Sequence, residues 1–124
     1  MRKLIICYYV IYVLFLTYYS LTPQENIFSE NLWDKALHFF AYVFLVILIK
    51  NVHIRLSYFS CLLICCNYSF IIECIQYYIP NRQLDVLDML ANLLGTLLGL
   101  IIYYLIIEKC FKKWRGTTVK AVNK

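Results

Sequence analysis

Four long apolar segments dominate this sequence and leave few folds open to it. They cover residues 4–21, 35–49, 54–79 and 85–107. Each approaches the roughly 20 residues that an α-helix needs to cross a hydrocarbon core of about 30 Å. The alternation of apolar and polar residues that marks a transmembrane barrel is absent. We therefore predict an all-α, polytopic membrane protein built as a four-transmembrane-helix bundle.

The composition supports this class of protein. Hydrophobic residues make up 63% of the 124 residues and charged residues 15%, against about 45–50% and about 25% in soluble globular domains. The first segment has a basic start like a signal peptide, but no small-x-small cleavage site follows it, so we interpret it as a retained helix. We expect one transmembrane domain over residues 1–109 and a basic cytoplasmic tail over residues 110–124.

The lysines and arginines are unevenly distributed and predict the orientation of the bundle. Ten of the 12 fall at the N-terminus, in the loop after the second segment, where we place Lys50, or near the C-terminus. Only Lys35 and Arg82 belong to the other side. Because cytoplasmic loops collect Lys and Arg, both termini should be cytoplasmic. The net charge of +5 then requires no nucleic acid, and the tail should favour anionic membrane lipid.

Three of the four segments carry polar residues near their predicted outward ends. Within each segment these residues recur at helical spacing and therefore share one face. An ionised side chain at the bilayer centre costs about 2.5–3.5 kcal/mol on insertion scales, so the polar faces should point toward one another. We predict an outward-facing ligand-binding pocket that contains Asp34, Lys35, His38, Tyr42, Glu73, Gln76, Arg82, Asp85, Asp88 and Asn92.

Helix geometry adds three expectations about this pocket. Asp34 and Asp85 stand at the starts of the second and fourth segments, where a carboxylate caps unpaired backbone N–H groups. The second segment has only fifteen residues, a length of about 22 Å, so we expect its outer end to lie below the lipid surface, under a water-accessible funnel. Gly95 and Gly99 form a small-xxx-small pair, which predicts close packing against a neighbouring helix.

The polar residues also form a series of motifs in a fixed order. The series is S-L-x-P (Ser20, Leu21, Pro23), D-K-x-x-H-F-x-x-Y (Asp34, Lys35, His38, Phe39, Tyr42), E-x-x-Q (Glu73, Gln76), P-x-R (Pro80, Arg82) and D-x-x-D-x-x-x-N-x-x-G-x-x-x-G (Asp85, Asp88, Asn92, Gly95, Gly99). This series, which covers residues 20 to 99, resembles the VanZ-like family of small bacterial membrane proteins. The resemblance implies a multi-pass protein of the bacterial cytoplasmic (inner) membrane with a role in the cell envelope. It also implies a possible link to glycopeptide (teicoplanin) resistance, but it supplies no reaction.

Three functions remain open from the residues themselves. The pocket could bind an amphiphile, such as a lipid-linked envelope precursor or an acylated antibiotic, with Lys35 and Arg82 donating to an anionic headgroup. His38 with Asp34 or Asp88, or Glu73 alone, could instead perform acid–base catalysis on a lipid-linked or cell-wall substrate. No nucleophile elbow, HExxH or Gly-rich phosphate loop supports an enzyme. Finally, the polar residues could form interhelical hydrogen bonds that only fix the register of the helices, in a subunit of a larger envelope complex with membrane protein partners.

Metals and cofactors are not predicted. A metal held by His38 with Asp34 and Glu73 is less favoured than a hydrogen-bonded histidine within a charged cluster. The 6 cysteines show no CxxC spacing, so neither zinc nor disulfides are expected from them.

Overall fold

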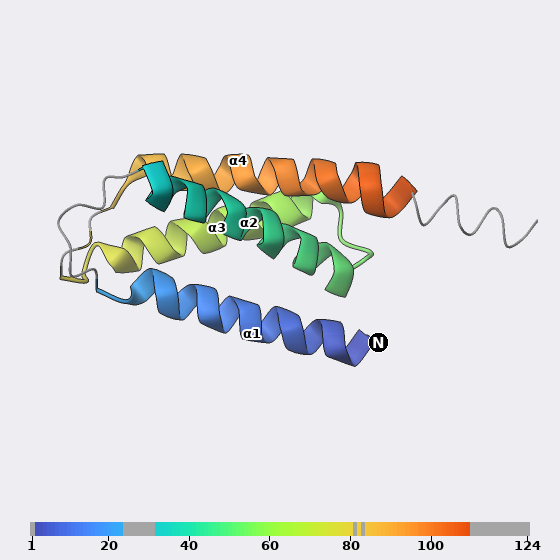
Figure 1. Ribbon diagram of the computed structural model, residues 1–124, viewed down its shortest axis with the longest axis horizontal. Coiled ribbons are helices and arrows are strands. Elements are labelled where there is room, and N and C mark those ends of the chain that lie inside the picture. Colours follow the sequence, from blue (N-terminus) through green and yellow to red (C-terminus); the bar gives the residue numbers. More distant parts are fainter. Residues whose placement is uncertain (1, 24–31, 81, 83, 110–124) are drawn as a thin grey trace, which may run out of the picture.

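The computed structural model describes residues 2–23, 32–80, 82 and 84–109, and all regular structure in them is helical. The helices are α1 (Arg2–Leu21), α2 (Leu32–Val52), α3 (Tyr58–Gln76) and α4 (Val86–Ile102), and α4 continues directly into the π-helical η1 (Tyr103–Glu108). Each of the four is long and apolar enough to cross a membrane. Successive helices run in opposite directions, with α1 flanking α2 and α3 (Figure 1). The prediction of an all-α four-helix membrane bundle is confirmed.

Helix α2 is longer than predicted. It spans 21 residues, about 31 Å at the helical rise, so the prediction of a short second helix over residues 35–49 was wrong. A funnel that depended on that short helix loses its basis. The apolar pattern alone placed the boundary at Lys50, whereas the helix continues through this lysine to Val52.

Lys50 lies in the last turn of α2 and not on the connecting loop where we had placed it. Its side chain is buried, and its ammonium donates to the Leu56 carbonyl oxygen at 2.8 Å. The ammonium also lies 4.4 Å from the ring centre of Tyr58 and 5.4 Å from that of Tyr103. Aromatic faces attract a cation at such distances. Lys50 therefore joins α2 to the start of α3 and to η1.

Helix α3 is shorter than the predicted 54–79. It begins after Ser57, whose hydroxyl oxygen accepts the backbone N–H of Ser60 at 3.0 Å, the usual arrangement of an N-cap. It ends at Gln76, and turn hydrogen bonds follow up to Ile79. The residue before a proline avoids helical backbone angles, so Pro80 explains why the helix does not continue. Helix α4 starts at Val86, one residue after the predicted boundary.

The closest helix–helix contact joins α4 to α2, and two glycines allow it. A Cβ atom added to Gly95 would fall on the backbone carbonyl oxygen of Phe39. A Cβ added to Gly99 would meet a Val46 methyl group and lie 2.7 Å from the Val43 carbonyl oxygen. The backbones can approach this closely only because both positions lack a side chain. The structure thus supplies the contact that the small-xxx-small spacing predicts.

Side-chain hydroxyl groups along helix α1 attach it to its neighbours. The Tyr12 hydroxyl donates to the Ala41 carbonyl oxygen of α2 at 2.8 Å, and the hydroxyls of Thr17 and Tyr68 lie 2.9 Å apart. Most of its other side chains, including Leu14 and Tyr18, are exposed. An apolar exposed face of this length suits contact with acyl chains.

Candidate functional site

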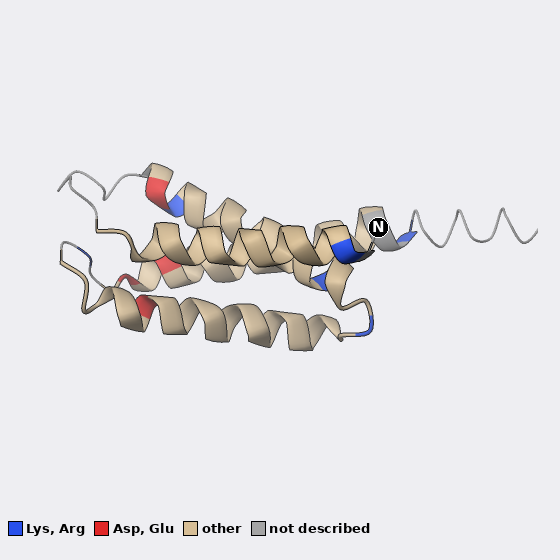
Figure 2. Ribbon diagram, turned by 90° about the horizontal axis from the view of Figure 1, so that it is seen from below, with Lys and Arg blue, Asp and Glu red and all other residues tan. Residues whose placement is uncertain are grey.

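The start of α2, the end of α3 and the start of α4 meet at one end of the bundle (Figure 1). In Figure 2 the residues coloured as Asp or Glu gather at this end, whereas most of those coloured as Lys or Arg lie at the other. The chain alternates direction, so the polar motifs of three helices reach the same end although they are far apart in sequence. This end is the candidate site.

The Lys35 ammonium joins α2 to α4 at the centre of this cluster. It lies 2.8 Å from Oδ2 of Asp85 and 3.2 Å from Oδ1 of Asp88. The side chain of Asp88 is only 10% exposed, so its charge needs a compensating partner. Lys35 provides that partner from the facing helix.

Asp85 is the N-cap of α4, as the sequence predicts. Its Oδ1 accepts the backbone N–H of Leu87 at 2.7 Å, and its backbone is extended. Asp34, also predicted as a cap, lies instead within the first turn of α2. The pKa of Asp85 is lowered below its ordinary value of 3.8, and the main cause is its hydrogen bond with the Lys35 ammonium.

This lowered pKa predicts a pH-dependent contribution to stability. A carboxylate with a lower pKa in the folded state stabilises the fold above its unfolded-state pKa of about 3.9, and this stabilisation is lost as the pH falls through the folded-state pKa. Asp85→Asn keeps a good capping residue but removes the charge. We expect the variant to be less stable than the unmodified protein at pH 7 and the difference to shrink below about pH 4. Unfolding midpoints in detergent between pH 7 and pH 3 measure it, and parallel curves would contradict it.

Glu73 and Gln76 connect α3 to the other helices from buried positions. Glu73 is fully buried, and its Oε2 accepts the backbone N–H of Asp85 at 3.2 Å. Its Oε1 has no hydrogen-bond partner within the described chain. Gln76 donates from Nε2 to the Ser20 carbonyl oxygen at 2.8 Å, which ties α3 to the end of α1.

Asn92 and Tyr42 continue the polar face below the charged cluster. Asn92 donates from Nδ2 to the Ser69 hydroxyl at 2.8 Å, and both side chains are buried. Tyr42 is also buried, with its ring beside that of Tyr68 at a centroid distance of 6.1 Å. These residues therefore lie inside the bundle and face neither solvent nor lipid.

Arg82 forms no ion pair with a carboxylate of the described residues. Its Nε donates to the Thr22 carbonyl oxygen and its Nη2 to the Tyr19 carbonyl oxygen, each at 3.4 Å. Carbonyl groups at the end of a helix carry partial negative charge, which favours a nearby cation. The Arg82 guanidinium thus lies at the C-terminal end of α1. Both of its hydrogen bonds there are long.

A cavity of about 270 Å³ lies between α1 and α2 next to Arg82. Most of its wall is apolar or aromatic, and the cationic Arg82 and the imidazole of His38 add polar groups to it. The lining residues are Tyr12, Phe15, Leu16, Tyr19, Ser20, Leu37, His38, Ala41 and Arg82.

Only His38 and Arg82 among these lining residues belong to the pocket predicted from the sequence. Helix α1 contributes five of them, and we had assigned none of its residues to the site. Their positions in the sequence, from Tyr12 to Ser20, recur three and four residues apart and so mark one helical face. That spacing was the available signal, but nothing in it separates a cavity wall from ordinary helix packing.

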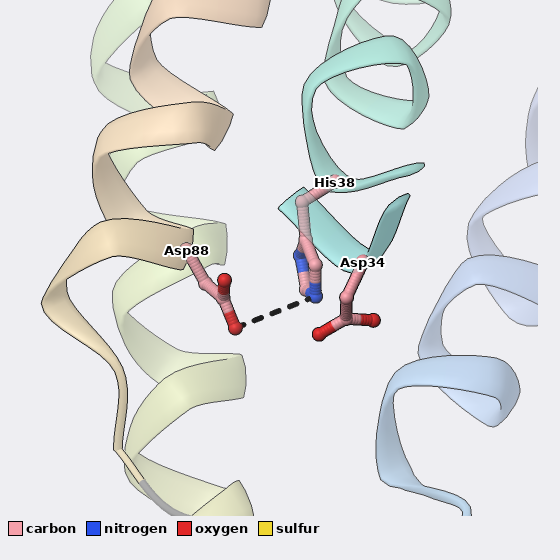
Figure 3. Close-up of side chains that lie close together, drawn as sticks. All are labelled: Asp34, His38 and Asp88. Atoms are coloured by element: carbon pink, nitrogen blue, oxygen red, sulfur yellow. Dashed lines mark ion pairs between the residues drawn. The ribbon is translucent and has the colours of Figure 1, made fainter. Parts of the chain in front are cut away.

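The cluster also brings together a set of groups able to hold a metal ion. One ligand atom each from Asp34, His38 and Asp88 lie within 4.8 Å of one another (Figure 3). This set differs from the metal ligands considered from the sequence, because Asp88 of α4 takes the place of Glu73 of α3.

Comparisons with known proteins give one result about ancestry. No curated protein and no solved structure matches the chain. The family model described as VanZ/LLP1 matches residues 5–107, which include α2 to α4, all of α1 but its first residues, and every residue of the polar cluster. The resemblance in the motifs is thereby confirmed, and the chain belongs to the VanZ/LLP1 family.

Proposed function

We propose that this membrane protein binds an amphiphile with an anionic headgroup in the cavity between α1 and α2. The observation that carries the proposal is the composition of the cavity wall, in which Arg82 and His38 stand beside a largely apolar surface. Binding sites of small molecules combine such a surface with a few polar groups that fix orientation. A guanidinium is well suited to carboxylate or phosphate.

The position of the cavity supports a ligand that remains partly in the membrane. Its lining includes Phe15 and Leu37, whose side chains are also exposed on the outside of the bundle. Acyl or prenyl chains can therefore leave the cavity sideways, between α1 and α2. The volume of about 270 Å³ suits a headgroup and the first part of a chain, since complete drug-sized pockets hold about 300–1,000 Å³.

The orientation predicted from the charge distribution suggests that this ligand comes from the cell envelope. If the termini are cytoplasmic, the polar end faces outward, where lipid-linked envelope precursors and acylated glycopeptides such as teicoplanin are found. Binding of either kind would connect the protein to the cell envelope and to glycopeptide susceptibility.

Arg82 offers the sharpest test of this proposal. Arg82→Gln should weaken binding of a polyprenyl phosphate to the protein in nanodiscs at least about tenfold, the equivalent of about 1.4 kcal/mol. The hydrogen bonds that Arg82 makes are long and exposed, so the stability of the fold should change little. Arg55→Gln is the matched control, because Arg55 is an exposed arginine in the loop at the other end of the bundle.

The same pair of variants can be compared in cells. A bacterium that expresses the protein should lose any change in teicoplanin susceptibility with Arg82→Gln and keep it with Arg55→Gln, at equal protein levels. Equal ligand affinity in both variants would remove Arg82 from the site and would leave the proposed cavity without its headgroup contact.

A further inference from the structure

We propose that Asp34, His38 and Asp88 form a binding site for a divalent transition-metal ion, with Zn²⁺ as the best-matched ion. The site joins α2 to α4 at the polar end of the bundle and shares only His38 with the proposed amphiphile cavity. Imidazole and carboxylate are both established zinc ligands, and three protein ligands plus an open position are typical of reactive zinc sites.

The geometry of His38 and Asp88 is the first argument. His38 Nε2 and Asp88 Oδ2 point toward each other from the two helices (Figure 3). Their separation of 3.7 Å is longer than a hydrogen bond. Two ligands of a tetrahedral zinc ion lie roughly 3.3 Å apart at bond lengths of about 2.0 Å. The pair is therefore spaced for an ion between its atoms, with only a small inward shift.

The remaining contacts of Asp88 and Asp34 are the second argument. Asp88 is nine-tenths buried, and Lys35 binds only its Oδ1, which leaves Oδ2 on the side of His38. A hydrogen bond to the other oxygen is how proteins orient a carboxylate ligand. The Asp34 side chain makes no hydrogen bond or ion pair with any other described residue, although Figure 3 shows it beside the His38 ring.

Charge balance is the third argument. The Lys35 ammonium pairs with Asp85 and Asp88, and Asp34 lies near Asp88 and His38. Arg82 donates to backbone carbonyl groups of α1 and forms no ion pair with these carboxylates. The three aspartates thus outnumber the one ammonium that pairs with them, at the end of a helix bundle where low polarity makes uncompensated charge costly. A divalent cation supplies this missing charge.

The two histidines of the chain provide a matched experiment. Purified protein is stripped with a chelator, exposed to Zn²⁺ alone and freed of unbound metal, and retained zinc is then measured by mass spectrometry. We expect one ion per chain in the unmodified protein and in His53→Ala, whose histidine is exposed in the loop at the opposite end. His38→Ala should bind Zn²⁺ at least about tenfold more weakly, since the loss of even an outer-shell partner of a metal ligand costs at least about this much.

A second variant protects the test against misfolding. Asp34→Asn changes a partly exposed side chain with no described hydrogen bond, so the fold should persist while zinc affinity falls by a similar factor. Co²⁺ in place of Zn²⁺ should give visible absorption bands in the unmodified protein and in His53→Ala, and these bands should be lost in His38→Ala. Equal zinc binding in His38→Ala and His53→Ala, or no retained zinc in the unmodified protein, would overturn the proposal.

Discussion

Gly95→Ala should destabilise the bundle by about 3 kcal/mol, at the upper end of the cost of overpacking a helix contact. The added methyl group would overlap the Phe39 carbonyl oxygen. A carbonyl group of a continuous helix cannot rotate away, so α2 and α4 must separate along their whole contact. Unfolding of the purified protein in mixed detergent micelles measures the loss. Leu94→Ala is the control, since Leu94 is the neighbouring residue and its side chain is about half exposed.

Gly99 provides a comparison that separates a backbone clash from a side-chain clash. A methyl group at Gly99 meets a methyl group of Val46 as well as the Val43 carbonyl oxygen. Val46→Ala should therefore recover part of the stability lost in Gly99→Ala. No side-chain substitution on α2 should rescue Gly95→Ala. Rescue of Gly95→Ala by Val46→Ala would show that α2 and α4 do not meet in the register described here.

The polar cluster was predictable because its information lies within single helices. Asp85, Asp88 and Asn92 are three and four residues apart, so any helix places them on one face, and the cost of exposing them to lipid turns that face inward. Likewise, Gly95 and Gly99 indicate a close contact by their spacing alone. None of these inferences needs to know which helices are neighbours.

The cavity and the metal set were not predictable for the opposite reason, since both depend on the register between helices. Whether His38 faces Asp88 or Glu73 is decided by how α2 lies against α4 and α3, and single-helix periodicity does not contain that information. The contribution of Tyr12 and Phe15 depends in the same way on how α1 lies against α2.

Lys50 shows a different limit of sequence reasoning. A charged residue at the end of an apolar run is normally taken as the helix boundary and as a marker of the cytoplasmic loop. Here the lysine stem is buried, and the ammonium is accommodated by a carbonyl oxygen and aromatic rings. The residues that make this possible, Leu56, Tyr58 and Tyr103, come from other parts of the chain. No window around Lys50 contains more than part of that environment.

Lys35→Met should cost about 3 kcal/mol, because it leaves the buried carboxylate of Asp88 without its cation and buried pairs lose about 3–5 kcal/mol when one partner is removed. Because 28% of the Lys35 side chain is exposed, we expect a loss at the lower end of this range. Lys3→Met, at an exposed lysine near the start of α1, should change stability little. Unfolding in mixed micelles measures both.

The double variant Lys35→Met with Asp88→Leu then distinguishes a polar cluster that only holds the helices together from one that binds a ligand. An apolar pair often replaces a buried ion pair without loss of stability, so most of the cost of Lys35→Met should be recovered. If the cluster served only to hold the helices in register, this double variant would also keep any effect of the protein on teicoplanin susceptibility. We expect instead a stable protein that no longer retains Zn²⁺, because Asp88 is a proposed ligand and its carboxylate is gone. A double variant as unstable as Lys35→Met alone would show that the ion pair is not what joins α2 to α4 at this end.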